Sequence, residues 1–468
     1  MKQQLVSLAR NCLRNIPLSM QHKQTIRHFF FSKFPSSFRH LPAYSLWRLE
    51  HPEISAEEFR KMDLPKKRSE ALKTGAFDKN SNPSVLMVTH SLGGGTEHHV
   101  QQLGQKLTDE RTNVWALRSL GHEWVRIVPY QSIEEEGLIF HIENEKDALI
   151  EQLKALNLSL IHVHHFVDFA PGFMQIVHDL ATALKLPYDF TAHDYLSICP
   201  RFTLYDDVVR GYCGEPDVSR CSGCVKTYGS SAGKEVDVEQ WRADYAQFLN
   251  GARHVYTPDM DVKTRLERYL PDATIINRPH WDEAPITPLK QNRKAGEPLR
   301  ILTLGGIAPH KGSMVLKECA EDAKKRGLAI EFTLIGFSDI DWQLKKHIPV
   351  SGPYKAHELP DLLEQGQFDV IFLPAVWPET FNYTLSEALH YGLYPVCFDI
   401  GAIARRVKEL GYGSVLPYKD YRYAGKINDA LLAINLPDEI PVKKLESAQV
   451  NYKNILQDYY NLEIKAAT

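Results

Sequence analysis

The chain has 468 residues, of which 43% are hydrophobic and 24% are charged, and its formal net charge is −3. This length exceeds what a single hydrophobic core usually organises, so we expect two or three domains. The near-neutral charge excludes the strongly basic character that is typical of nucleic-acid-binding proteins.

Residues 1–48 differ from the rest of the chain. They contain eight Lys or Arg residues, no Asp or Glu, and several aromatic residues. Prolines at intervals predict short helices in the extension and linker over residues 1–80. Two interpretations remain open. The segment is a helical extension docked on the main body with its basic face in solvent, or it makes a peripheral contact with an anionic membrane surface.

No segment reaches the roughly 18 consecutive apolar residues that a membrane-spanning helix needs. The N-terminal residues are interrupted by Arg10, Asn11 and Arg14, which is atypical of a secretory signal. The seven cysteines are an odd number, which argues against a disulfide framework. We therefore expect a cytoplasmic protein, with attachment at the inner face of the membrane if residues 1–48 bind lipid.

From residue 84 onward, short apolar runs alternate with helical stretches. The first series of runs covers residues 84–90, 112–118, 137–142, 160–166, 187–193 and 254–257. After a polar, proline-containing linker, the second series covers residues 299–305, 329–336, 369–375, 394–401 and 413–417. Alternation of this kind predicts α/β domains built on parallel sheets with helices on both faces. We assign one such domain to residues 81–280, a second to 281–440, and a C-terminal helix to 441–468.

Three motifs follow predicted strands. Gly93-Gly94-Gly95-Thr96-Glu97 lies between a strand and a helix, where it allows close approach of an anionic ligand; the alternative is a tight turn with Thr96 as the helix N-cap. The turn at 305–312 places Lys311 at the carboxyl edge of a strand, where it either neutralises a phosphate or is simply solvated.

The third motif, over residues 377–389, is the most informative. Glu379 falls in a loop after an apolar strand, and Glu387 falls about one turn into the following helix. The free amides at such a helix start can bind a phosphate, with Glu387 on ribose hydroxyls and Glu379 on a sugar. The alternative is an ordinary helix with acidic residues on its surface and near its favourable dipole end.

The run PETFNYTLSEAL resembles the E-x7-E motif of glycosyltransferase family 4, and LTLGGIAPHKG and GGGTEHHV resemble two further motifs of that family. The resemblance covers about residues 84–435 in several ordered pieces. It implies the GT-B fold, in which two Rossmann-like domains face a cleft. It also implies a retaining transfer from a nucleotide sugar, without an obligatory catalytic metal.

Carried over by position, the resemblance implies a role for each matching residue. Glu379 contacts the donor sugar, Glu387 the ribose, and Lys311 the diphosphate. The phosphate-binding positions are Asn382, Tyr383 and Thr384. From the first domain, Gly94 and Gly95 face the donor phosphate or the acceptor, and His193 matches the active-site histidine of the family.

Two positions depart from the family pattern. Gly306 stands where many members carry a second cationic Arg, and His310 is a candidate to replace part of its function. Asn382 stands where a Gly is usual. Both departures raise the prospect of an unusual donor or of weakened activity.

Two groups of residues suggest metal chemistry. The cysteines at 199, 213, 221 and 224 lie in a polar, loop-like insertion. A structural Zn²⁺ site, free thiols, and a redox or cluster role remain open for Cys199, Cys213, Cys221 and Cys224. For His162, His164 and His165 we expect packing or cleft lining rather than metal ligation.

The sequence therefore predicts a retaining glycosyltransferase that uses a nucleotide-sugar donor and a glycan or lipid-linked glycan acceptor, with no nucleic-acid partner. Bacterial surface polysaccharide assembly is the pathway that the resemblance suggests. The alternatives are a nucleotide-sugar epimerase of the same fold and a non-catalytic scaffold subunit of a glycan-assembly complex.

Overall fold

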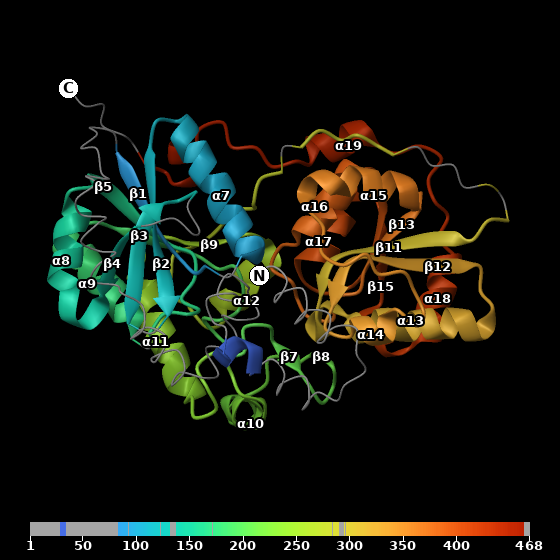
Figure 1. The fold of residues 1–468 in the computed structure, drawn as a ribbon, viewed down its shortest axis with the longest axis horizontal. Coiled ribbons are helices and arrows are strands. Elements are labelled where there is room, and N and C mark those ends of the chain that lie inside the picture. The colour runs from blue at the N-terminus through green and yellow to red at the C-terminus, as the bar shows by residue number, and fades with distance from the viewer. Residues whose placement is uncertain are drawn as a thin grey trace.

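The computed structural model describes residues 29–33, 83–91, 93–121, 123–131, 137–170, 172–282, 284–289, 294 and 296–462. Residues 29–33 form a helix; the remainder of the predicted N-terminal extension lies outside the described residues. Two α/β lobes stand side by side, each built around its own sheet (Figure 1). None of the described helices has both the length and the hydropathy needed to cross a membrane.

The first sheet has the strand order β10-β9-β6-β5-β1-β2-β3-β4. The strands are β1 (Ser84–Thr89), β2 (Asn113–Gly121), β3 (Trp124–Pro129), β4 (Leu138–His141), β5 (Leu158–Val163), β6 (Tyr188–Thr191), β9 (Val255–Thr257) and β10 (Ile275–Asn277). All six residues of β1 are buried, as expected for a strand covered on both faces. The surrounding helices are α7 (Gly94–Asp109), α8 (Ile142–Lys154), α9 (Phe173–Leu184), α11 (Val238–Asn250) and α12 (Met260–Glu267).

The expectation of a purely parallel sheet is wrong at one edge of this first sheet. β3 pairs antiparallel with β2 and with β4. The connection between Gly121 and Trp124 is far too short for the crossover that a parallel neighbour requires, so the chain turns back as a hairpin.

The second sheet is parallel throughout, in the order β12-β11-β13-β14-β15. Its strands are β11 (Leu299–Ile307), β12 (Ile330–Ser338), β13 (Val370–Leu373), β14 (Tyr394–Phe398) and β15 (Ser414–Leu416). Its helices are α13 (Ser313–Arg326), α14 (Asp341–Leu344), α15 (Leu359–Gly366), α16 (Tyr383–His390), α17 (Gly401–Leu410) and α18 (Ala424–Leu432). Each strand predicted from an apolar run in this half of the chain is present.

The C-terminal segment does not form the single helix that we expected. It contains α19 (Val442–Ser447) and, after an irregular stretch, a π-helical turn, η4 (Ile455–Tyr459). Figure 1 shows this red segment returning to the first lobe. There η4 joins an apolar cluster with β1 and α7, and the Glu110 carboxylate accepts hydrogen bonds from the Ile455 and Leu456 amides. Burial of Tyr459 and Tyr460 against the first sheet decides this path over helical propensity.

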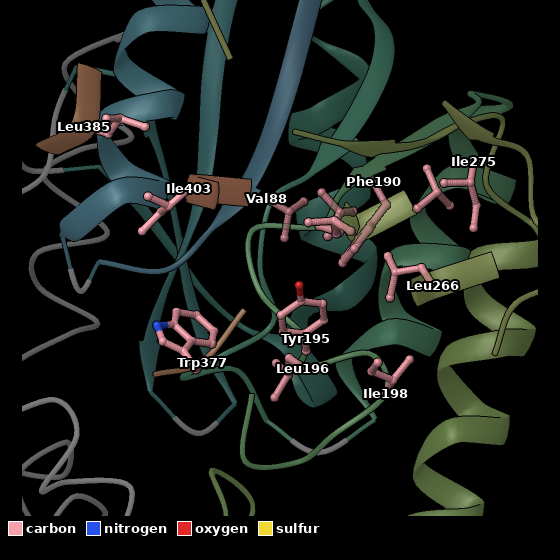
Figure 2. Close-up of a cluster of buried hydrophobic side chains, with 14 of the residues drawn as sticks. Val88, Phe190, Tyr195, Leu196, Ile198, Leu266, Ile275, Trp377, Leu385 and Ile403 are labelled. Atoms are coloured by element: carbon pink, nitrogen blue, oxygen red, sulfur yellow. The ribbon is translucent and has the colours of Figure 1, made fainter. Parts of the chain in front are cut away.

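The two lobes share one continuous apolar cluster. Figure 2 shows Trp377 of the second lobe beside Tyr195 and Leu196 of the first, and the rings of Trp377 and Tyr195 have centroids 6.2 Å apart. A partly buried ion pair joins the same lobes, because Arg405 on α17 donates two 2.8 Å hydrogen bonds to Asp259 at the start of α12. The contact between the lobes is therefore packed as well as polar.

Candidate functional site

The turn after β11 depends on a glycine that no other residue can replace. Gly312 has φ +84°, and a Cβ at this position would lie 1.9 Å from the carbonyl oxygen of Pro374. This close approach lets the 3-10 turn Pro309–Lys311 sit against the end of β13. Lys311 therefore stands at the carboxyl edge of the sheet, where open α/β folds bind their ligands.

The loop before α16 holds a nearly buried carboxylate. Glu379 is 6% exposed and accepts a 2.7 Å hydrogen bond from the Asn382 side-chain amide. The Asn382 side chain also accepts hydrogen bonds from the Leu385 amide at 2.6 Å and from the Thr384 hydroxyl at 2.8 Å, so it caps the helix. Asn382 has φ +104°, which explains why glycine is the usual residue here, and asparagine tolerates such angles better than most residues. The substitution thus retains the backbone conformation and adds a contact that orients Glu379.

These two loops line an open pocket with a volume of about 50 Å³. Five of the predicted site residues line it: Gly306, Lys311, Glu379, Asn382 and Thr384. Glu387 lies one turn along α16, as the sequence predicted, and its side chain is partly buried. Burial, with a smaller contribution from nearby Asp282, raises the pKa of the Glu387 carboxyl, whereas His390 opposes this shift.

His310 and Gly306 bear on the prediction that His310 replaces part of the function of a missing arginine. Burial, followed by the nearby Lys311 charge, lowers the pKa of His310 to about 3, so its ring is neutral near pH 7. The unliganded structure therefore gives no support to His310 as the second cation that we considered. A Cβ on Gly306 would lie 3.0 Å from the Phe337 ring, so a longer side chain there would have to displace this ring.

The first lobe meets this loop through its glycine-rich turn. A Cβ on Gly95 would lie 3.6 Å from the Tyr383 ring, and the rings of His98 and Tyr383 have centroids 4.3 Å apart. The Thr380 hydroxyl donates a 2.6 Å hydrogen bond to the carbonyl oxygen of His193. Residues that lie almost 300 positions apart in the chain are thus brought to one interface between the lobes.

The glycine-rich turn is anchored by an ion pair that the sequence did not reveal. Helix α7 begins at Gly94 with Gly93 as its N-cap, so the alternative with Thr96 as the cap is wrong. The Glu97 carboxylate accepts hydrogen bonds from both terminal nitrogens of Arg118 on β2, at 2.7 and 2.9 Å. Arg118 is fully buried. Glu97 thus fixes the start of α7.

Arg406 is a further site residue that sequence reasoning missed. Its guanidinium donates to the Asn382 carbonyl oxygen at 3.0 Å and to the Ser386 hydroxyl at 2.8 Å, and it lies over the Phe381 ring at 4.3 Å. Arg406 therefore supports the loop that carries Glu379. No local pattern marks it, because its partners lie twenty or more residues earlier in the chain.

Histidines gather where the first sheet faces the second lobe. Each of His99, His164 and His193 offers one nitrogen, and the three nitrogens lie within 4.8 Å of one another. Burial is the main cause that lowers the pKa of all three rings, so they are neutral near pH 7. His162 and His165 are hydrogen-bonded in place by neighbouring side chains, in agreement with the packing role that we expected for them.

The four cysteines of the insertion line one small pocket of about 30 Å³. It lies next to the short hairpin of β7 (Tyr205–Asp206) and β8 (Gly211–Tyr212) and helix α10 (Val218–Tyr228). Burial raises the pKa of the Cys199 thiol to about 12 and that of Cys213 to about 11. Cys224 accepts a hydrogen bond from Arg201 at 3.2 Å, and Cys221 accepts one at 3.4 Å from a second arginine. All four cysteines thus line the same pocket.

Comparison with known proteins finds a family match for the second lobe. Residues 287–440 match the family Glycosyl transferases group 1. No curated protein sequence matches the chain. The fold is similar to that of sucrose-phosphate synthase from Thermosynechococcus elongatus, with a TM-score of 0.50 and 14% identity over 79% of this chain and 92% of that chain.

Two other solved structures align over a similar share of the chain. Anabaena HepE in complex with UDP-glucose has a TM-score of 0.48 and 10% identity, over 78% of this chain and 93% of that one. The lipopolysaccharide outer core galactosyltransferase WaaB in its apo form has a TM-score of 0.49 and 10% identity, over 78% and 95% of the two chains.

The family match covers the lobe that contains Lys311, Glu379 and Glu387, and the two facing sheets give the fold. Residues 287–440 therefore match the group 1 glycosyltransferases, enzymes that transfer a sugar from a nucleotide-sugar donor, and the two facing lobes have the arrangement of the GT-B fold.

Proposed function

We propose that the chain is a retaining glycosyltransferase that moves a sugar from a nucleoside-diphosphate sugar to a hydroxyl of a glycan or lipid-linked glycan, in the assembly of a bacterial surface polysaccharide. In this proposal residues 281–440 bind the donor and residues 81–280 bind the acceptor. The observation that carries it is the shared cavity, because Lys311 and Glu379 line the same space at the carboxyl edge of a parallel sheet.

The donor diphosphate is proposed to bind between Lys311 and the start of α16. No side-chain partner of the Lys311 ammonium is seen among the described residues, so it is free to meet an anion. The first amides of α16 have no partner within the helix, and the helix dipole favours negative charge there. As the bond to the sugar breaks, charge develops on the leaving diphosphate, and these groups stabilise it. No metal is required for this role.

The two glutamates are proposed to bind the ribose and the sugar of the donor. Glu387 accepts hydrogen bonds from the ribose hydroxyls, which offset the cost of ionising a partly buried carboxyl. Glu379, held by the Asn382 amide, contacts the sugar. Gly306 lacks the cationic side chain that the family often has at this position, so Lys311 and the helix amides are the proposed phosphate contacts.

The acceptor side is formed by His193, Gly94 and Gly95. These residues lie on the first lobe and contact or adjoin the loop that carries Glu379. In the proposed front-face substitution, the leaving phosphate takes the acceptor proton while His193 hydrogen-bonds the sugar or the acceptor. Residues 1–48 are proposed to give the enzyme a peripheral contact with an anionic membrane.

Thermal unfolding in the presence of UDP-, GDP-, dTDP- and CMP-linked sugars tests this proposal. A ligand at 100 times its dissociation constant stabilises the folded state by about 2.7 kcal/mol. We expect stabilisation by one donor class, lost in Lys311→Ala and Glu387→Gln. The matched control is Lys324→Ala, because Lys324 is an exposed lysine at the far end of α13.

The alternatives give different results in the same preparation. An epimerase would convert the stabilising donor into an isomeric sugar nucleotide without any acceptor. A scaffold subunit would be folded and would respond to no donor. Either result would overturn the proposed transfer reaction.

The cysteines of the insertion remain candidate ligands of a structural Zn²⁺. Four thiolates can hold together a segment with little apolar core of its own. Determination of metal content in a variant that carries serine at all four positions tests this assignment, separately from the site described next.

A further inference from the structure

The buried histidines of the first lobe are not all explained by packing. His162 donates or accepts through both ring nitrogens, at 2.7 Å to the Tyr460 hydroxyl and 2.8 Å to the Thr191 hydroxyl. His165 binds the Asp194 carboxylate at 2.8 Å and accepts a hydrogen bond from the Val167 amide. These two rings are fully hydrogen-bonded.

His99 and His164 differ, because both are 0% exposed and each has a nitrogen without a hydrogen-bond partner. These atoms are Nδ1 of His99 and Nε2 of His164. A buried polar atom that lacks a hydrogen-bond partner destabilises the folded state. The other nitrogen of His164 lies 3.1 Å from Nε2 of His193. The cluster thus holds more nitrogen atoms than the described protein groups can satisfy.

We propose that His99, His164 and His193 bind one transition-metal ion of the Zn²⁺ class at the boundary between the lobes. The three donor nitrogens lie within 4.8 Å of one another. Two nitrogens at the usual zinc distance of 2.0–2.1 Å in a tetrahedral site lie about 3.3 Å apart, so a small inward movement of the rings completes the geometry.

The chemistry of the three side chains selects the ion. Neutral imidazole suits Zn²⁺, Co²⁺, Ni²⁺ and Cu²⁺, whereas Mg²⁺ and Ca²⁺ require oxygen ligands. The site therefore differs from one that would hold Mg²⁺ on the donor diphosphate.

The ligands come from three elements of the first lobe. His99 lies on α7, and the other two histidines follow β5 and β6. An ion here ties the glycine-rich helix to the sheet edge. Three protein ligands leave a fourth position open, as in catalytic zinc sites. His280 is the nearest further imidazole, since its ring centroid lies 3.9 Å from that of His99 and its Nδ1 also lacks a partner.

The ion changes what His193 can do, and this part rests on the proposed function. A ligated imidazole no longer accepts a proton through the bound nitrogen, so His193 is excluded as a general base at that atom. Its second nitrogen still donates a hydrogen bond, and the ion fixes the direction of that bond. The role of His193 is then to orient the sugar or the acceptor.

Metal content measured by mass spectrometry tests the site in protein purified without a polyhistidine tag. We expect about one Zn²⁺ per chain from the three-histidine site, lost in His164→Phe and retained in His162→Gln. The variant with serine at the four cysteine positions keeps this ion. Wild-type protein that is folded but binds no metal from a zinc-supplemented buffer would overturn the proposal, and so would metal that is lost only from the cysteine variant.

Cobalt-substituted wild-type protein gives a second result that does not depend on the folding of His164→Phe. Ligation by imidazole lacks the intense sulfur-to-cobalt charge-transfer absorption of thiolate sites. We expect the cysteine-to-serine variant to retain a cobalt spectrum without that absorption. A spectrum due entirely to thiolates would refute the histidine site. Neither readout requires a sugar donor, so the metal site and the proposed transfer reaction can fail independently.

Discussion

The ion pair between Glu97 and Arg118 makes the strongest stability prediction. Arg118 has no exposed surface, and Glu97 binds it through both carboxylate oxygens. The remaining contacts of the guanidinium are the carbonyl oxygens of His90 and Tyr130, each at 3.0 Å. Glu97→Ala therefore leaves a buried cation without an anionic partner.

Removal of one partner from a buried pair costs about 3–5 kcal/mol. A domain of this size loses roughly 2–4 °C of melting temperature per kcal/mol, so we expect a decrease of about 6–20 °C in the unfolding transition of the first lobe. Differential scanning calorimetry measures it. The matched control is Glu151→Ala, because Glu151 is 68% exposed in its pair with Lys154 and such pairs contribute about 0–1 kcal/mol.

The double variant Glu97→Leu/Arg118→Met separates charge burial from packing. Replacement of both partners by apolar residues of similar size is often nearly neutral, so we expect it to recover most of the lost melting temperature. The reasoning is refuted if Glu97→Ala shifts the transition no more than Glu151→Ala, or if the double variant is as unstable as the sum of its two single changes.

Three further predictions concern the site. Because burial raises the pKa of Glu387, ionisation at neutral pH disfavours the folded state. Glu387→Gln should therefore raise the melting temperature of the unliganded protein at pH 8. The gain should be much smaller at about pH 4, close to the usual pKa of an unfolded glutamate, below which the carboxyl is protonated in both states; an equal gain at both pH values would contradict this. Gly312→Ala should prevent donor binding and lower stability by several kcal/mol, because its Cβ would lie 1.9 Å from the Pro374 carbonyl oxygen. Gly327→Ala, at φ +62° with open space around it, should cost only about 1–2 kcal/mol in the same thermal assay, and similar losses in the two variants would refute the steric argument. Thr380→Val should lower the free energy of unfolding by roughly 1 kcal/mol, because it removes a hydrogen bond between the lobes. It should also raise KM in a transfer assay, and an unchanged KM would show that this contact does not help to assemble the site.

Much of the second lobe could be read from the sequence alone. Its strands are short apolar runs buried on both sides, and Glu379 and Glu387 fall in the loop and the helix where their spacing placed them. Local patterns suffice here because a parallel strand and the turn that follows it are continuous in sequence. The gathering of Lys311 and Glu379 in one cavity follows from the same rule, since the carboxyl ends of parallel strands share one edge.

Tertiary structure decided the features that join distant parts of the chain. From the sequence, Glu97 is interpreted as part of a ligand-binding turn. In the structure its carboxylate pairs instead with Arg118, 21 residues later. Likewise, the path of the C-terminal segment follows from the burial of Tyr459 and Tyr460, not from helical propensity. The convergence of His99, His164 and His193 depends on which strands are neighbours in the sheet. Sequence spacing specifies periodicity along one element, whereas charge pairing, burial and ligand geometry depend on long-range contacts that form only when the sheet is assembled.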